Sequence, residues 1–188
     1  MSDQERRESD PRAAELLDRY TAAFGAHEGA VPVDKIATDL LGLRVVQAEQ
    51  LGVSGLLVPG SRYVYLDARE ARDSEGRRRF TLAHEIGHWV CQCDEGVSAP
   101  PEPILCRPAD MAAGPDASLE HEANNFAASL LMPEAAIRAA AADGMDCGEA
   151  ASWFSVSEIA MKWRYFNLQI TDARPQRAES AHRPSETG

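Results

Sequence analysis

The chain has 188 residues, of which 44% are hydrophobic and 26% are charged, and its formal net charge is −11. This length and composition suit one globular domain, whereas so negative a charge argues against a nucleic-acid-binding or anionic-membrane surface. No apolar run reaches the roughly eighteen residues of a membrane span, and residues 1–8 lack the apolar core of a secretory signal. We therefore expect a cytoplasmic protein.

The first part of the chain predicts two packing helices. Residues 1–9 are charged and poor in apolar side chains, so we expect them to be disordered. Asp10 and Pro11 then provide an N-cap and a first helical residue for a helix that ends at Gly25. A second helical pattern begins at Val33 and stops at Gly42.

Three strand-like runs follow, at residues 43–48, 53–58 and 63–67. The last two flank the turn signal at residues 59–62 and should form a hairpin, so we expect a small antiparallel three-stranded sheet. Its free edge can pair with an extended peptide, or the sheet can simply cover a helix, and the sequence leaves both open. The charged run at residues 70–79, rich in arginine, is interpreted as a solvated loop and a first helical turn.

The pattern His84-Glu85-x-x-His88 lies inside a helical stretch. At about 3.6 residues per turn the two histidines share one face, one turn apart, so both imidazoles can bind a single metal ion. Glu85 is rotated off that face, beside the position of a metal-activated water. Apolar and small neighbours indicate that this helix is buried, and buried polar groups need partners. The pattern is therefore typical of zinc hydrolases.

Cysteines flank the next segment, a long irregular crossing at residues 94–117 that we expect to form the rim of a cleft. Cys91, Cys93 and Cys106 could form a second zinc site or a redox cluster. The usual paired C-x-x-C spacing is missing, however, and no fourth ligand is evident. Reduced thiols are the favoured interpretation for a cytoplasmic protein.

Residues 118–133 predict a second functional helix that packs against the first. A catalytic zinc needs three protein ligands and an open position, so one more ligand is required. Glu120 and Glu122 are candidates, and His121 is a weaker one. Glu120 shares a face with small apolar residues, whereas Glu122 points about 160° away, so Glu120 is favoured.

Two segments resemble the ImmA/IrrE family of bacterial metallo-endopeptidases, and the resemblance spans about residues 30–170. They are Arg-Phe-Thr-Leu-Ala-His-Glu-Ile-Gly-His at 79–88 and Glu-x-x-Ala-Asn-x-Phe-Ala-Ala-x-Leu-Leu-Met-Pro at 120–133. The resemblance implies a zincin-like, gluzincin-like protease in which His84, His88 and Glu120 bind zinc and Glu85 is the general base. It also implies a protein partner: family members often cleave a helix-turn-helix repressor encoded nearby and so release stress or mobile-element genes.

The C-terminal part predicts an Ala-rich helix at 135–142 and two short helices at 145–170 that resemble a helix-turn-helix. Charges between residues 148 and 170 cancel, and a phosphate-binding helix should be basic. We therefore interpret 145–170 as a packing subdomain of the same unit and expect no direct nucleic-acid contact. The tail, 171–188, is expected to be disordered.

Taken together, the sequence predicts an α+β, zincin-like metallopeptidase domain at 10–144, with a small antiparallel three-stranded sheet on a mainly helical body. The predicted activity is zinc-dependent peptide hydrolysis, with Glu85 moving the proton of the attacking water. Asn124, one turn beyond Glu120, is expected to orient its neighbour. The oxyanion donor is left open among the following side chains: Tyr63, Tyr65, His121 and Tyr165.

A non-catalytic regulator is the alternative. It would bind DNA or a repressor through the C-terminal helices, and its metal site would be structural or vestigial. A structural zinc site is closed by a fourth protein ligand, for which Cys91 or Cys93 is the nearby candidate.

Overall fold

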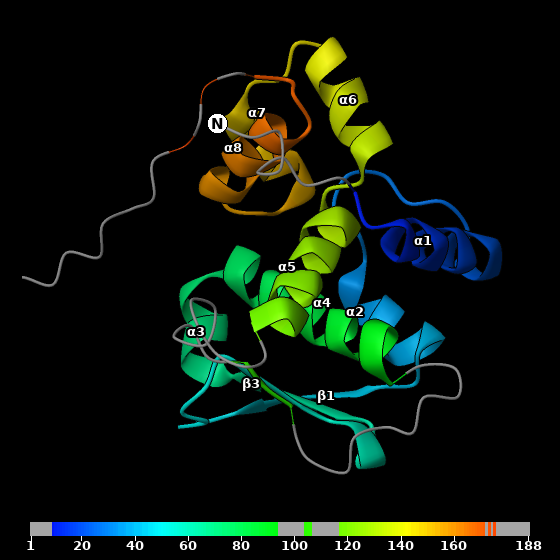
Figure 1. Cartoon of the computed structure of the whole chain (residues 1–188), viewed down its shortest axis with the longest axis vertical. Coiled ribbons are helices and arrows are strands. Elements are labelled where there is room, and N and C mark those ends of the chain that lie inside the picture. Colours follow the sequence, from blue (N-terminus) through cyan, green and yellow to red (C-terminus); the bar gives the residue numbers. More distant parts are fainter. Residues whose placement is uncertain (1–8, 94–103, 107–116, 172, 174, 176–188) are drawn as a thin grey trace, which may run out of the picture.

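The computed structural model describes residues 9–93, 104–106, 117–171, 173 and 175. The described part of the chain forms helices and one small sheet, so the predicted α+β class is confirmed (Figure 1). The elements are α1 (Pro11–Phe24), α2 (Val33–Lys35) continuing into a π-helical turn (Ile36–Leu40), β1 (Arg44–Ala48), β2 (Gly55–Val58), β3 (Tyr63–Asp67), α3 (Ala68–Asp73), α4 (Glu75–Gln92), β4 (Ile104–Cys106), α5 (Ala117–Leu131), α6 (Glu134–Ala142), α7 (Cys147–Phe154) and α8 (Glu158–Asn167).

The bounds of α1 follow from its terminal residues. The Asp10 side chain accepts a hydrogen bond from the backbone N–H of Arg12, and Pro11 occupies the first helical position. Gly25 ends the helix with a φ of 91°, which residues with a side chain rarely adopt. The predicted start and stop of this helix are confirmed.

The sheet has the order β1-β3-β2-β4. The predicted hairpin is confirmed, because β2 and β3 pair antiparallel across a short 3-10 turn at Pro59–Ser61. The prediction of an antiparallel three-stranded sheet is corrected in two respects: β1 pairs parallel to β3, and β4 adds a fourth strand beside β2. Residues 49–54 pass across the end of β3, where Ser54 O accepts from Asp67 N at 3.0 Å, so β3 lies between the first two strands.

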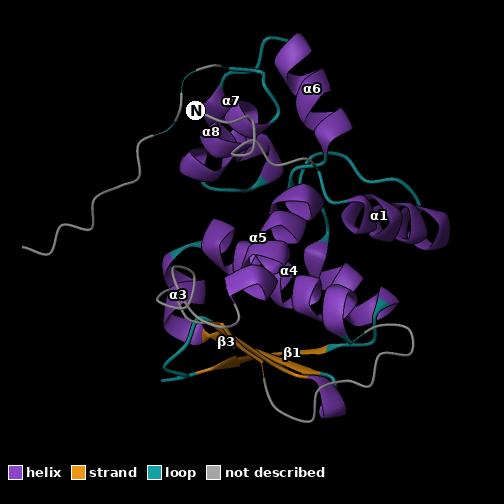
Figure 2. Ribbon diagram, viewed as in Figure 1, coloured by secondary structure: helices purple, strands orange, loops and turns teal. Residues whose placement is uncertain are grey.

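Helix α4 lies on one face of the sheet (Figure 2). Along β3, Val64 and Leu66 are fully buried, while Tyr63 and Tyr65 alternate with them and stack on each other on the opposite, half-exposed face. The hydrophobic core continues from α1 through α4 and α5 to α8. The buried side of the sheet is therefore the side that faces α4.

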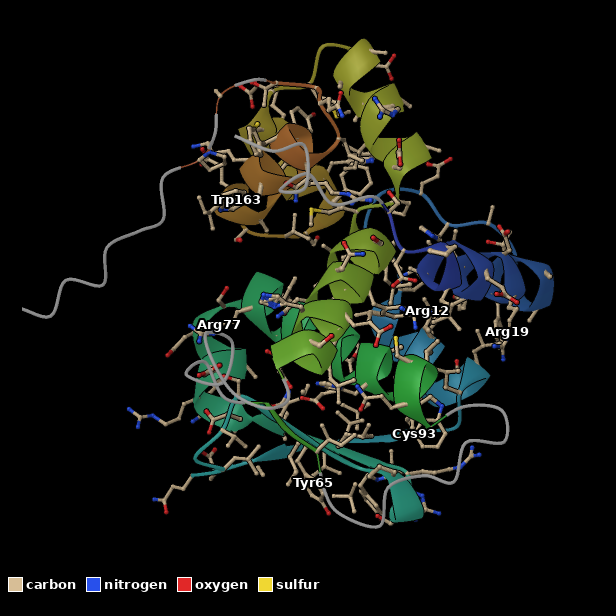
Figure 3. The ribbon with its side chains drawn as sticks, in the orientation of Figure 1. Arg12, Arg19, Tyr65, Arg77, Cys93 and Trp163 are labelled. Atoms are coloured by element: carbon tan, nitrogen blue, oxygen red, sulfur yellow. The ribbon has the colours of Figure 1, made fainter. Side chains whose placement is uncertain are left out.

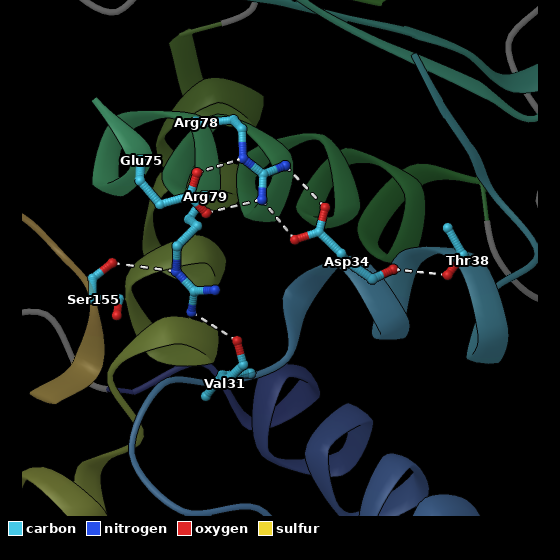
Figure 4. Close-up of polar contacts among 7 residues, drawn as sticks. All are labelled: Val31, Asp34, Thr38, Glu75, Arg78, Arg79 and Ser155. Atoms are coloured by element: carbon cyan, nitrogen blue, oxygen red, sulfur yellow. Dashed lines mark hydrogen bonds and ion pairs between the residues drawn. The ribbon is translucent and has the colours of Figure 1, made fainter. Parts of the chain in front are cut away.

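The predicted first helical turn is present in the arginine run, and Arg69, Arg72 and Arg77 are exposed, but the run is helical rather than a loop. Residues 68–73 and 75–92 are the helices α3 and α4, and the Arg79 side chain is only 7% exposed. Its guanidinium donates to Val31 O at 2.7 Å and to Ser155 O at 3.2 Å, while Arg78 forms a double contact with Asp34 at 2.7 and 2.9 Å (Figure 4). These contacts join α4 to α2 and to the turn between α7 and α8.

Both predicted C-terminal helices are present as α7 and α8, which pack against each other. Asp146 and Glu149 form a capping box at the start of α7. In the turn that follows, Ser155 takes a left-handed conformation with a φ of 52°. The likeness of α7 and α8 to a helix-turn-helix stays a prediction, as does the subdomain boundary at residue 145.

Several expectations concern residues that the structure leaves undescribed. The disorder expected for 1–9 and 171–188 and the rim expected at 94–117 fall mainly outside the described residues. Within the described part, each helix is too short or too polar to cross a membrane.

Candidate metal centre

Helices α4 and α5 approach closely at Gly87. A Cβ at this position would lie 3.1 Å from Ala123 Cα and O and 3.2 Å from the Phe126 ring, closer than nearly all real Cβ contacts. Gly87 lies between the two histidines of α4, and Ala123 lies one turn after Glu120 on α5. The missing side chain therefore lets Glu120 reach the histidine pair.

Three buried side chains converge at this crossing. Nε2 of His84 and Nε2 of His88 are 2.9 Å apart. The Glu120 carboxylate spans both rings, with Oε2 3.2 Å from His84 Nε2 and Oε1 3.2 Å from His88 Nε2. All three residues are at most 4% exposed. The two histidines and Glu120, predicted from separate segments, thus meet at one point.

This group fits a divalent metal ion. Two nitrogens bound to one tetrahedral zinc at about 2.0–2.1 Å are about 3.3 Å apart, close to the separations seen here. Glu120 Oε2 is buried and makes no hydrogen bond despite its short contact with His84, so an electron-rich oxygen faces the two ring nitrogens. The His84, His88 and Glu120 group contains no cysteine. Neither Cys91 nor Cys93 therefore closes it as a fourth ligand, and within the described part of the chain no other His, Cys, Asp or Glu joins the three.

The outer nitrogen of each imidazole also has a partner. Nδ1 of His84 lies 3.0 Å from Asn124 Oδ1, and Nδ1 of His88 lies 3.0 Å from the side-chain amide of Gln92. The sequence predicts that Asn124 orients Glu120, whereas in the structure its side chain contacts His84. Gln92 was missed, although its position four residues after His88 on the same helix is a signal that the sequence contains.

Glu85 lies fully buried beneath strand β2. A Cβ on Gly55 would overlap its carboxylate oxygen and would come within 2.8 Å of the Thr81 methyl group, so a side chain there would require Glu85 or Thr81 to shift. Among the residues that the structure describes, neither carboxylate oxygen of Glu85 has a hydrogen-bond partner. Burial raises the pKa of Glu85 well above its usual value, and the negative charge of Glu120 raises it further. A carboxyl group in such surroundings is suited to general acid–base chemistry.

The pKa of the second carboxyl group, Glu120, shifts in the opposite direction. Burial alone would raise the pKa of Glu120, but its contacts with His84 and His88 outweigh that effect and lower the pKa to about 2. Glu120 is therefore an anion at neutral pH, as a metal ligand must be. Two neighbouring carboxyl groups with opposite shifts commonly have different tasks.

The other candidate ligands lie elsewhere. Glu122 forms an ion pair with Arg12 at 2.8 Å, and His121 is exposed on α5. Cys91 and Cys93 form no disulfide, and burial raises the pKa of Cys91 to about 12, which keeps its thiol protonated. These observations agree with reduced thiols, although the Cys106 side chain lies outside the described part.

Three of the four candidate oxyanion donors are not close to the group. Tyr65 lies on the face of the sheet opposite to α4 (Figure 3), and Tyr63 stacks on it. The Tyr165 hydroxyl, on α8, donates to Met145 O at 3.2 Å. His121 follows Glu120 directly in the sequence and is the remaining candidate.

Comparisons with known proteins agree with this geometry. The family profile Peptidase_M78, described as the IrrE N-terminal-like domain, matches residues 41–165. A search of curated proteins gave no match. Among solved structures, a Mycobacterium tuberculosis transcriptional regulator matches with a TM-score of 0.56 and 16% identity over 84% of this chain and 47% of that one. The chain thus spans about half of that protein's length, and at this identity the likeness is one of fold alone.

Proposed function

Because this chain belongs to the Peptidase_M78 family, whose profile covers more than half of it, we propose that it is a zinc-dependent endopeptidase of the cytoplasm. One observation carries the proposal. The buried group of His84, His88 and Glu120 adjoins a buried carboxyl group, Glu85, that has no hydrogen-bond partner. Two histidines, one carboxylate and an open position form the donor set of catalytic zinc in metalloproteases.

In the proposed mechanism, each residue has one task. His84, His88 and Glu120 would hold the ion, which when bound supplies a Lewis acid that polarises the scissile carbonyl and acidifies a water molecule. The Glu85 carboxylate takes a proton from the attacking water and carries it to the amine nitrogen of the leaving peptide. A raised pKa suits this task, because the group must hold the proton between the two steps.

We further propose that the substrate is a helix-turn-helix repressor encoded nearby, whose cleavage serves a stress or mobile-element response. The resemblance to the ImmA/IrrE family supports this, and the fold also occurs in a protein named as a transcriptional regulator. The net charge of −11 offers no basic surface for DNA. A protein target is therefore the better match to this chain.

The test is incubation of the zinc-loaded protein with the repressor-like protein encoded closest to it, followed by mass mapping of the products. We expect one defined cut. Glu85→Gln should bind zinc as the wild type does and should cleave about 100- to 10,000-fold more slowly, the usual contribution of a general base. Cleavage by Glu85→Gln at the wild-type rate would remove Glu85 from the mechanism. A wild type that binds no zinc would refute the metallopeptidase proposal.

The alternative, a non-catalytic regulator that acts through the C-terminal helices, is favoured by one observation. Trp153 on α7 and Ile159 on α8 are 51% and 43% exposed, which is unusual for large apolar side chains. Contact with DNA is disfavoured, because Arg164 is buried and Lys162 is paired with Glu158. A DNA shift assay at increasing salt tests this: binding that weakens steeply with salt would support DNA contact.

A further inference from the structure

Gln92 is the last residue of α4, and it lies one turn beyond His88. Its side-chain amide is 3.0 Å from His88 Nδ1, just as the Asn124 amide is 3.0 Å from His84 Nδ1. The two rings stand nearly perpendicular, at 82°. Each imidazole is therefore held from outside by an amide, while its Nε2 faces Glu120.

The two amides differ in the atom that they present. A neutral imidazole can bind a metal through one nitrogen only when the other nitrogen carries the proton. Asn124 presents its oxygen, so His84 Nδ1–H donates to it and Nε2 keeps a lone pair. Gln92 presents its nitrogen. An amide N–H donated to His88 Nδ1 would leave the proton of His88 on Nε2, where it would block a metal.

A half-turn of the Gln92 amide about its Cγ–Cδ bond exchanges its nitrogen and oxygen at nearly the same positions. Gln92 Oε1 then accepts a hydrogen bond from His88 Nδ1–H, and Nε2 of His88 presents a lone pair beside that of His84. Such an outer contact orients a metal-binding histidine and commonly changes metal affinity 10- to 100-fold.

We propose that Gln92 is the positioning residue of His88: its amide oxygen fixes the Nδ1–H tautomer and aims Nε2 at the ion. This inference rests on the proposed zinc site, but it assigns a function to a side chain outside the three ligands. The fit is specific for a side chain that ends in an acceptor at this distance. A carboxylate at residue 92 would serve as well, whereas an apolar side chain of similar length would not.

The experiment compares Zn²⁺ affinity, measured by competition with a chelator, in Gln92→Leu, Gln92→Glu and the wild type. We expect Gln92→Leu to bind Zn²⁺ about 10- to 100-fold more weakly and Gln92→Glu to bind at least as tightly as the wild type. Gln47→Leu is the matched control, because Gln47 is an exposed glutamine on β1; its affinity should not change. Circular dichroism checks that each variant is folded.

A second readout does not depend on affinity. In the zinc-loaded wild type, ¹⁵N NMR of the imidazoles should show the proton of His88 on Nδ1. Equal affinity of Gln92→Leu and wild type, equal losses in the Leu and Glu variants, or a proton on Nε2 would each overturn the assignment of Gln92. Failure of the wild type itself to bind Zn²⁺ would instead refute the proposed function, and this inference with it.

Discussion

Two regions of the molecule bury charged side chains, and they treat them differently. Arg79 and Arg164 lie where α4 and α8 meet the rest of the fold, and both donate to backbone carbonyls, Arg164 to Met132 O at 2.9 Å. At the α4–α5 crossing, Glu85 is buried more completely, yet both of its oxygens lack a partner. Burial thus comes with hydrogen bonds in one region and, among the described residues, with an unpaired carboxyl group in the other.

The difference separates structural from functional charges. A buried ionic group costs several kcal/mol unless its hydrogen-bonding capacity is met. Arg79 and Arg164 meet it by binding carbonyls next to helix ends, Ser155 after α7 and Met132 after α5, so their contribution is to the fold. Among the described residues neither oxygen of Glu85 meets it, and of the Glu120 carboxylate Oε2 does not. Native proteins keep few such groups, and a bound ion or catalysis is a common reason.

The largest expected effect is on zinc affinity and concerns Glu120, at the α4–α5 crossing. Glu120→Ala removes one of three metal-binding side chains, and we expect zinc affinity to fall at least about 1,000-fold, or roughly 4 kcal/mol. The fold should persist, because the contacts that the protein loses are confined to those of Glu120 with His84 and His88. Isothermal titration with zinc measures the change, and Glu122→Ala, which alters an ion pair with Arg12, is the control. Unfolding of the Glu120 variant would erase the distinction between the two regions.

Removal of a hydrogen-bonded buried arginine should instead lower the stability of the fold. Arg164→Met leaves Met132 O buried without its donor, so the free energy of unfolding should fall by about 3 kcal/mol. Urea unfolding measures this, and Arg138→Met, at a half-exposed arginine, should cost less than about 1 kcal/mol. Zinc affinity below the midpoint should stay as in the wild type. A change confined to zinc affinity would place Arg164 with the functional charges.

A substitution at Gly87 should change both the stability of the fold and its affinity for zinc. Gly87→Ala places a methyl group against Ala123 and Phe126, which should cost about 1–3 kcal/mol of stability, partly offset by the better helix propensity of alanine. Because α5 must shift, zinc affinity should fall as well. Gly60→Ala, where a Cβ meets no atom within 4 Å, is the control in both assays. Unchanged zinc affinity in Gly87→Ala would show that α5 need not approach so closely.

The smallest effect concerns Asp34 and Arg78, a pair at the surface. The Arg78 side chain lowers the pKa of Asp34 below its ordinary value of 3.8, so the pair stabilises the fold above about pH 4 and ceases to do so as the pH falls through the lowered pKa. Asp34 is half exposed, and we expect Asp34→Asn to cost less than about 1 kcal/mol at neutral pH. The difference in unfolding free energy between the two proteins should shrink as the pH is lowered from about 4 to acid pH. A constant difference down to that pH would assign the effect to packing.

Local signals in the sequence predicted most elements and the three converging side chains. Capping residues located α1, and helical periodicity aimed Glu120 rather than Glu122 at the histidines. Both depend on neighbours within one or two turns, which the sequence contains directly. The family resemblance is confirmed by the profile match.

Contacts between distant segments could not be predicted in the same way. The parallel pairing of β1 with β3 depends on how residues 49–54 cross the sheet. The burial of Arg79 depends on carbonyls at Val31 and Ser155, and the lack of room for a side chain at Gly55 depends on Glu85 of α4. The charge and hydropathy of each residue can be read from the sequence. These contacts, however, join residues that are close together only in the folded chain.

Strand β2 sets a condition on how a substrate enters. Through Gly55 its backbone covers Glu85, and it already pairs with β3 on one side and with β4 on the other. An interior strand has no unpaired row of amides and carbonyls to offer a peptide. A substrate peptide that reached Glu85 by pairing with β2 as an added strand would have to displace β4, Ile104–Cys106. On that route a peptide competes with these three residues of the protein itself for the same hydrogen bonds of β2.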